Sequence, residues 1–153
     1  MLAGNAVGNA TATGRGNDRR PAGMGGGQMG EADNVRAVER LVTGLNAKDV
    51  EVMNEVFVDD SILSWPQSGE IIRGRENRQG IYRAFPSLPT ITPYRTVSSG
   101  DLVISEAELD YGTETYQVVF IFECRDGKIV RETAYWAKPF PAPEWRAKWV
   151  GRA

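Results

Sequence analysis

The feature that most constrains the fold is the stretch from Tyr116 to Trp136, where two apolar runs flank the tripeptide Arg-Asp-Gly at positions 125–127. Both runs are rich in β-branched and aromatic residues, and Asp-Gly is a common hairpin turn, so the stretch predicts a β-hairpin. Two loop lengths are compatible with this pattern. A two-residue loop pairs Cys124 with Ile129, whereas a three-residue loop with a bulge pairs Cys124 with Lys128.

The face patterns favour the three-residue loop, because that register separates a strongly apolar face from a mixed one. The apolar face then carries Tyr116, Val118, Phe120, Phe122, Val130, Glu132, Ala134 and Trp136. Glu132 is the only formal charge on this face. A buried carboxylate needs a partner or a raised pKa, so Glu132 is the first candidate for a functional group.

Composition excludes several classes of function. The 153 residues suffice for one domain with a hydrophobic core, and a net charge of −2 without a basic block argues against binding to nucleic acid. The sequence has no histidine, which removes mechanisms with a histidine base and argues against a transition-metal site, so we expect no metal and no cofactor. The single cysteine, Cys124, cannot form an internal disulfide.

The composition changes along the chain and divides it into three parts. Residues 1–30 hold nine of the 17 glycines and few large apolar residues, a composition that predicts disorder. This segment lacks the apolar region of a secretory signal, and no apolar run approaches ~18 residues, so we expect a cytoplasmic protein with no membrane segment. A folded domain is predicted over residues 31–140, followed by an aromatic and proline-rich tail over 141–153.

Three helices are predicted before a run of strands. Apolar residues at helical spacing predict helices over residues 33–46, 49–57 and 75–85. Strands are predicted over residues 61–65, 70–73, 94–98 and 102–111, ahead of the hairpin. The prolines at positions 86, 89 and 93 predict irregular structure between the third helix and the third strand. This order indicates an α+β fold, with a cone-shaped curved antiparallel sheet and three N-terminal helices that enclose a pocket.

Four segments in this order resemble the nuclear transport factor 2-like superfamily, and within it the SnoaL-like, or polyketide cyclase-like, group. They read L-N-A-K-D at 45–49, V-F-V-D-D-S-I-L-S-W-P at 56–66, G-R-E-N-R-Q-G-I-Y at 74–82 and D-G-K-I-V-R-E-T-A-Y-W at 126–136. The resemblance covers residues 33–140 and implies the fold described above. It does not imply one activity, because the superfamily includes isomerases, polyketide cyclases, epoxide hydrolases, dehydratases and non-catalytic modules.

The catalytic residues of two relatives are missing at the matching positions. The tyrosine and two aspartates that ketosteroid isomerases use correspond to Leu41, Trp65 and Phe120. The Arg-x-Asp motif of limonene epoxide hydrolase corresponds to Glu-Leu-Asp at 108–110, and its last-strand aspartate corresponds to Ala134. The resemblance therefore implies neither of these two complete mechanisms.

SnoaL-type cyclases use acids and bases in the pocket, so the resemblance implies catalytic roles for Glu132 and Asp110, with Glu108 as a third candidate. Alternation along residues 102–111 leaves the direction of these acids open. The apolar set of that strand looks like the buried one, which would put Glu108 and Asp110 in water, whereas the relatives direct both positions into the pocket. A three-residue turn over 112–114 would place Asp110 in a row with Tyr116 and Trp136.

Each candidate also has a purely structural interpretation. Glu132 is either a general acid or base with a raised pKa, or a carboxylate paired with Arg73 or another basic group. The ligand-binding candidates, which are aromatic and could equally be core residues, are Trp65, Tyr82, Tyr116, Phe120 and Trp136. Arg75 and Arg78 are expected on a solvated helix face. Trp145 and Trp149 share one helical face, and we expect them to pack on the body or on a second subunit.

Two functions remain open at this point. One is a small-molecule enzyme or binder that takes an apolar, partly oxygenated ligand and performs cofactor-free acid–base chemistry, such as cyclisation, isomerisation or dehydration. The other is a non-catalytic ligand-binding or dimerisation module of the same fold. Val119 and Ile121 are apolar residues on the mixed face of the hairpin, so we also expect a homodimer that forms through the sheet.

Overall fold

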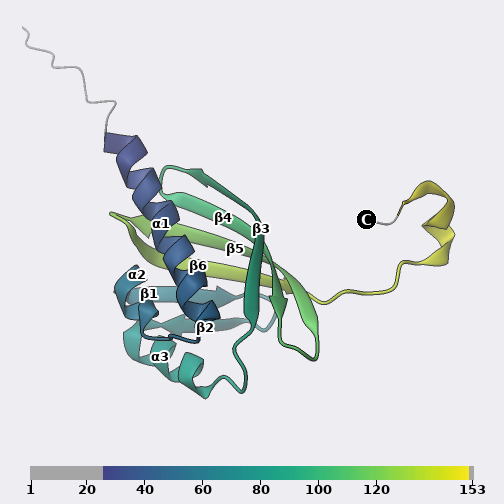
Figure 1. Cartoon of the computed structure of the whole chain (residues 1–153), viewed down its shortest axis with the longest axis horizontal. Coiled ribbons are helices and arrows are strands. Elements are labelled where there is room, and N and C mark those ends of the chain that lie inside the picture. Colours follow the sequence, from purple (N-terminus) through teal and green to yellow (C-terminus); the bar gives the residue numbers. More distant parts are fainter. Residues whose placement is uncertain (1–25, 152–153) are drawn as a thin grey trace, which may run out of the picture.

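Figure 1 shows a computed structural model of the chain, which describes residues 26–151. Two helices, α1 (Gly26–Asn46) and the short α2 (Val52–Val56), precede the strands β1 (Phe57–Trp65) and β2 (Glu70–Arg73). The third helix, α3 (Gly74–Ala84), is followed by four strands and a 3-10 helix. These are β3 (Thr90–Ser99), β4 (Leu102–Asp110), β5 (Thr115–Arg125), β6 (Lys128–Ala137) and η1 (Glu144–Trp149).

The six strands form one curved sheet in the order β2-β1-β6-β5-β4-β3, and the helices pack against one of its faces (Figure 1). This arrangement confirms the predicted α+β class, the curved sheet and the three N-terminal helices. Neighbouring strands are antiparallel except for β1 and β6, which pair in parallel. The sequence patterns did not predict that parallel pair, which brings the start of the domain beside its last strand.

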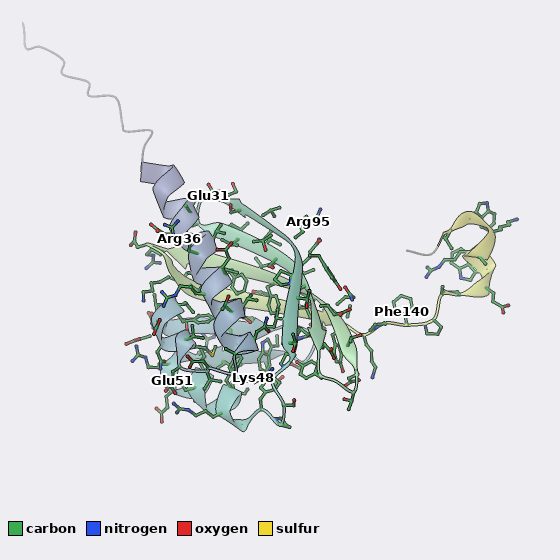
Figure 2. The ribbon with its side chains drawn as sticks, viewed as in Figure 1. Glu31, Arg36, Lys48, Glu51, Arg95 and Phe140 are labelled. Carbon is green, nitrogen blue, oxygen red and sulfur yellow. The ribbon has the colours of Figure 1, made fainter. Side chains whose placement is uncertain are left out.

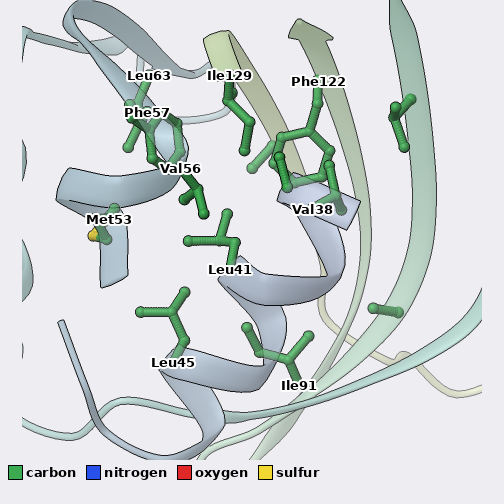
Figure 3. Close-up of a cluster of buried hydrophobic side chains, with 14 of the residues drawn as sticks. Val38, Leu41, Leu45, Met53, Val56, Phe57, Leu63, Ile91, Phe122 and Ile129 are labelled. Atoms are coloured by element: carbon green, nitrogen blue, oxygen red, sulfur yellow. The ribbon is translucent and has the colours of Figure 1, made fainter. Parts of the chain in front are cut away.

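The core lies between α1 and the face of the sheet that α1 covers, here called the inner face. Val38, Leu41 and Leu45 recur at helical spacing along α1, and all three are buried. Figure 3 shows the side chain of Val38 next to Phe122 of β5 and that of Leu41 next to Val56 of α2. The apolar stripe of α1 therefore forms the roof over the sheet.

The hairpin between β5 and β6 has the two-residue loop, so the preferred three-residue register was wrong. Asp126 and Gly127 both have positive φ, at 51° and 71°, as a type I′ turn requires, and Cys124 pairs with Ile129. A bulge between Glu123 and Cys124 in the pairing then shifts the register by one residue.

The bulge preserves most of the predicted faces. Beyond it Phe122 pairs with Glu132 and Phe120 with Ala134, so Glu132 shares the inner face with the phenylalanines. Ile129 is fully buried in place of Val130, which is the one exchange between the predicted faces and the observed ones. A two-residue loop without a bulge would have turned Glu132 to the other face.

Several element boundaries differ from the predicted ones. The helix α1 begins at Gly26, so the prediction of disorder was wrong for residues 26–30, while residues 1–25 lie outside the described part of the chain. The strand β3 is longer than predicted and contains Pro93. An edge strand has one free side, so it tolerates a proline that a central strand would exclude, and the pairing with β4 shifts between Pro93 and Arg95.

The tail that follows β6 runs away from the sheet, as Figures 1 and 2 show. Trp145 and Trp149 lie in η1 and are 75% and 69% exposed, and Phe140, labelled in Figure 2, is also exposed. The expectation that the two tryptophans pack on the body of the same chain was therefore wrong. Packing on a second subunit stays a prediction.

Candidate functional site

A pocket lies between the inner face of the sheet, the C-terminal half of α1, the end of α3 and the segment 85–89. Its cavity volume is about 40 Å³, which holds roughly three water molecules. The lining is mostly apolar and aromatic, as in many sites for small molecules. It consists of Leu41, Val42, Leu45, Trp65, Tyr82, Phe85, Leu88, Pro89, Ile91, Ser105, Leu109, Tyr111, Phe120, Phe122, Glu132 and Trp136.

Four of the five predicted ligand-binding residues line this pocket. Trp65 and Trp136 meet edge to face, with 5.3 Å between their ring centroids and 77° between their planes. Tyr82 and Phe120 also contribute to the lining. Tyr116 does not; its ring packs against Tyr111, and its hydroxyl donates a hydrogen bond to Glu114 at 2.8 Å.

Glu132 lies on the inner face of β6 and is 2% exposed. Its neighbours across the strands are Phe122 and Leu63, both buried and apolar. Among the described residues, no basic side chain forms an ion pair with it. Burial raises the pKa of Glu132 to about 7, although the positive charge of Arg78 acts in the opposite direction. A carboxyl group with this pKa can release or accept a proton near neutral pH.

Arg78 supplies the basic group near Glu132, and its burial contradicts the predicted solvated face of α3. The side chain is 0% exposed, and its guanidinium lies 4.9 Å from the centroid of the Phe57 ring. Its Nη1 donates to Ser61 Oγ and to the carbonyl of Val58 at 3.3 Å. Burial is the main cause that lowers the pKa of Arg78.

The spacing of α3 contained a signal for this burial. Arg78 lies four residues before Tyr82 and three before Ile81, so it belongs to the apolar stripe of the helix. Arg73, the partner that the sequence suggested for Glu132, is exposed on β2. The residue that sequence reasoning missed at this site is therefore Arg78.

Tyr82 provides a hydroxyl beside Glu132. The pKa of Tyr82 is raised well above its ordinary value, first by burial and then by the negative charge of Glu132. The phenol therefore stays protonated across the physiological range and keeps a hydrogen to donate. Together with Glu132 it places one proton donor and one titratable carboxyl group on the pocket wall.

Asp110 and Glu108 are not among the residues that line the pocket, so of the two directions left open by the sequence the structure has the outward one, and the catalytic roles that the resemblance implied lose their geometric basis. Asp110 pairs with Thr115 and accepts a hydrogen bond from the amide of Gly112 at 2.7 Å. Glu108 accepts hydrogen bonds from the hydroxyl of Tyr94 at 3.3 Å and from Gln117 at 3.2 Å. Both acids lie on the outer face of β4, which is the face turned away from the helices.

The direction of β4 follows from its apolar alternation and from the loop after it. Val103, Ser105, Ala107 and Leu109 are buried on the inner face. The loop to β5 has four residues, 111–114, closed by a hydrogen bond of 3.0 Å from the amide of Tyr111 to the carbonyl of Glu114. The predicted three-residue turn is therefore absent, and the expected pair of carboxylates in the pocket does not form.

Comparison with known proteins gives consistent results. A model of the SnoaL-like domain family matches residues 38–132. The structure is similar to that of an NTF-2 like protein of unknown function from Burkholderia xenovorans LB400, with 35% identity, a TM-score of 0.74 and coverage of 82% of this chain and 98% of that chain. No match was found among curated proteins.

More distant structures share the fold. One is named as a candidate ketosteroid isomerase from Kribbella flavida, with 23% identity, a TM-score of 0.74 and coverage of 80% of this chain and 91% of that chain. Another is named as a candidate SnoaL-like polyketide cyclase from Jannaschia sp. CCS1, with 19% identity, a TM-score of 0.61 and coverage of 79% and 91%. Within residues 26–151, no helix is long and apolar enough to cross a membrane.

Proposed function

Because the chain belongs to the SnoaL-like domain family, we propose that it binds an apolar, partly oxygenated small molecule and catalyses a proton transfer on it. Glu132 is the general acid or base of this reaction, and no cofactor takes part in the proposed step. The observation that carries the proposal is one carboxyl group with a pKa of about 7 in an aromatic pocket, without an ion-pair partner among the described residues.

The proposed step begins with ionised Glu132 and a ligand that has a C–H bond next to a carbonyl group. The carboxylate takes the proton, the electron pair of the C–H bond forms a carbon–carbon double bond, and the π pair of the carbonyl group moves to its oxygen, which gives an enolate. The hydroxyl of Tyr82 donates a hydrogen bond to that oxygen. Where the ligand has a β,γ double bond, Glu132 then returns the proton to the γ carbon, which completes an isomerisation. Alternatively, the enolate carbon attacks a second carbonyl of the same ligand and the resulting alkoxide takes the proton back from Glu132, which completes a cyclisation.

One carboxyl group suffices for this sequence, because the same group accepts and returns the proton. The proposal therefore replaces the pair of acids expected from the sequence with Glu132 alone. Tyr82 is the preferred hydroxyl donor, since Tyr116 already donates its hydroxyl hydrogen to Glu114. Arg78 acts at a distance, and its positive charge favours the ionised form of Glu132.

The experiment measures exchange of carbon-bound hydrogen for deuterium in a set of cyclic ketones dissolved in D2O. Glu132→Gln is expected to lower the enzyme-catalysed exchange rate by roughly 10²-fold or more, the contribution typical of a general base. Glu123→Gln, on the outer face of β5, is the matched control and should exchange at the wild-type rate. Exchange that is equally fast in Glu132→Gln would contradict the proposed role.

A second candidate function is a ligand-binding module without catalysis. The position of Asp110 and Glu108 on the outer face favours it, because the pocket then lacks the second acid that the family resemblance implied. Under this function the ketones bind to the wild-type protein, but none exchanges its hydrogen faster than in buffer. The exchange experiment therefore also distinguishes the two candidates.

We also propose that the chain forms a homodimer through the outer face of the sheet. Apolar side chains extend across this face, on which no described helix packs, and Val97 and Tyr135 are among its exposed members. Val119 and Ile121 lie between them on β5 and are half-buried. Contiguous exposed apolar area of this kind is typical of contacts between proteins.

A further inference from the structure

The side chains of the pocket wall offer more hydrogen-bond donors than groups that only accept. Two indole N–H groups, those of Trp65 and Trp136, are donors only, as is every indole. The hydroxyls of Tyr82 and Tyr111 add two further donors. Among the described residues that line the pocket, Glu132 alone has a polar side-chain group that, when ionised, accepts and does not donate. A ligand that complements this wall has more acceptors than donors.

The two indole N–H groups are the unexplained part of this wall. Both nitrogens are buried, and neither has a hydrogen-bond partner among the described residues. Trp65 as a whole is 8% exposed. A buried donor without an acceptor destabilises a folded protein, so such groups are rare and usually have a function.

The contact between the rings cannot satisfy both donors. In the edge-to-face geometry, at 5.3 Å and 77°, the edge of one indole meets the face of the other. An N–H group on that edge can use the π face as a weak acceptor. Only one of the two rings can present its edge in this contact, so at least one indole N–H still lacks an acceptor.

The register of the sheet places this pair near Glu132. Leu63 pairs with Glu132, and Trp65 follows Leu63 by two residues on the same face of β1. Two residues of a strand span roughly 6–7 Å. The strand positions of Trp65 and Glu132 are therefore separated by about this distance along the sheet, so one small ligand can reach both residues.

We propose that Trp65 and Trp136 form an acceptor-binding end of the pocket and select a neutral ligand that carries a carbonyl or similar oxygen at that end, distinct from the oxygen that Tyr82 binds in the proposed proton transfer. The inference rests on the proposed function only in sharing its pocket. It adds the groups that recognise an acceptor oxygen at one end of the ligand, which are the indole N–H groups of Trp65 and Trp136.

The neighbouring charges favour a neutral ligand. An organic cation would contact the aromatic faces and the carboxyl group of Glu132. It would leave the indole donors unpaired, and the positive charge of Arg78 already acts on the same carboxyl group. An anion would face Glu132, and no lysine or arginine lines the pocket. A neutral acceptor is the class that satisfies the indoles without either conflict.

The test follows the indole N–H signals by NMR in protein with ¹⁵N-labelled tryptophan. The four tryptophans give one indole signal each, and the spectra of Trp65→Phe and Trp136→Phe assign the two pocket signals. The exposed Trp145 and Trp149 serve as controls within the same molecule. The probes are cyclohexanone and methylenecyclohexane, which have the same ring and differ in the acceptor oxygen.

Cyclohexanone is expected to move the Trp65 or Trp136 indole proton downfield, while methylenecyclohexane does not and the Trp145 and Trp149 signals stay in place. The ratio of the two dissociation constants isolates the hydrogen bond, because both probes fill the same volume. Replacing both pocket tryptophans by Phe should lower the preference for the ketone by about tenfold, whereas Trp145→Phe should leave it unchanged.

Three results would overturn the inference. They are binding of both probes without a shift of either pocket indole, an unchanged ketone preference in the double Phe variant, and tighter binding of tetramethylammonium than of cyclohexanone. Glu132→Gln separates this inference from the proposed catalysis. That variant should still bind cyclohexanone with the same indole shift, even where hydrogen exchange is lost or was never present.

Discussion

Both faces of the sheet carry glutamate side chains, but those compared on the outer face are exposed and ion-paired, whereas Glu132 on the inner face is buried. On the outer face, Oε1 of Glu106 lies 2.5 Å from Nη2 of Arg95, and Oε1 of Glu123 lies 3.4 Å from Nε of Arg131. All four side chains are substantially exposed. On the inner face, Glu132 directly follows Arg131 in the sequence, yet it is buried without an ion-pair partner among the described residues. One step along β6 therefore separates the exposed, ion-paired Arg131 from a candidate catalytic group.

The difference teaches that the environment, and not the type of residue, decides what a carboxyl group can do. The outer acids lie in water beside basic partners, and exposed ion pairs of this kind stabilise a protein by about 0–1 kcal/mol. On the inner face, loss of hydration disfavours the charged form, and the pKa of Glu132 rises to about 7. Four predictions test this contrast.

The largest expected effect comes from adding a second carboxylate to each face. Val118→Glu puts an acid at a buried inner position of β5, and we expect it to lower the free energy of unfolding by about 4 kcal/mol or more at neutral pH. Val119→Glu, its neighbour on the outer face, should cost less than about 1 kcal/mol. Urea denaturation of both variants measures the difference, and equal losses would show that the two faces do not differ in polarity as described.

The second prediction is the pH dependence that Glu132 gives the fold. Its folded pKa of about 7 lies above the ordinary 4.5, so the folded state binds the proton more tightly than the unfolded state. The stabilisation of the folded state that protonated Glu132 provides is fully present below pH ~4.5 and is lost as the pH rises through about 7. The loss in the free energy of unfolding amounts to about 3 kcal/mol. Glu132→Gln removes this loss and should be more stable than wild type near neutral pH.

Melting temperatures of wild type and Glu132→Gln between pH 4 and 8 check this sign. Glu106→Gln is the matched control on the outer face and should run parallel to wild type over the same range. A Gln variant that is much less stable than wild type at pH 7 would mean that Glu132 is ionised and paired with Arg78, in which case its role is structural.

The placement of Glu132 also shows which features the sequence could predict. The inward direction of Glu132 followed from the alternation of apolar residues on β5 and β6, and it is correct although the loop length was not. The bulge beside Cys124 compensated for the shorter loop, and no residue pattern signalled it. A prediction of faces is robust here because burying apolar side chains dominates the energy, whereas the exact register depends on one local insertion.

Asp110 and Glu108 show the opposite case. The alternation along β4 indicated that they point outward, and the family resemblance suggested that they point into the pocket; the structure agrees with the alternation. The pairing of Asp110 with Thr115 across the four-residue loop 111–114 keeps both acids on the outer face. Arg78 was misplaced for a different reason. Arginine is usually exposed, so its charge outweighed its place in the apolar stripe of α3, and packing on Phe57 accompanies its burial.

The third prediction concerns Arg78, whose charge opposes the effect of burial on Glu132. Arg78→Met removes the charge and keeps most of the volume, so the pKa of Glu132 should rise further and the pH-dependent loss of stability should extend to higher pH. At pH 5 the net change should stay within about 1 kcal/mol, because relief of a buried unpaired charge offsets the lost hydrogen bonds. Arg75→Met, on the exposed part of α3, is the control. An unchanged pH profile in Arg78→Met would show that the two groups do not interact.

The smallest expected effect on stability, below about 1 kcal/mol, comes from Ile121→Lys on the outer face. The Ile121→Lys variant tests the state of association, because the proposed dimer buries this face. A lysine there would place two like charges in the contact. Sedimentation should show a dimer for wild type and a monomer for Ile121→Lys, while Val150→Lys, in the exposed tail beyond the sheet, should remain dimeric. A monomeric wild type, or a dimer that Ile121→Lys leaves intact, would reject the sheet as the interface. A dimer that Val150→Lys disrupts would assign the contact to the aromatic tail, and the outer face would then be apolar for a reason other than self-association.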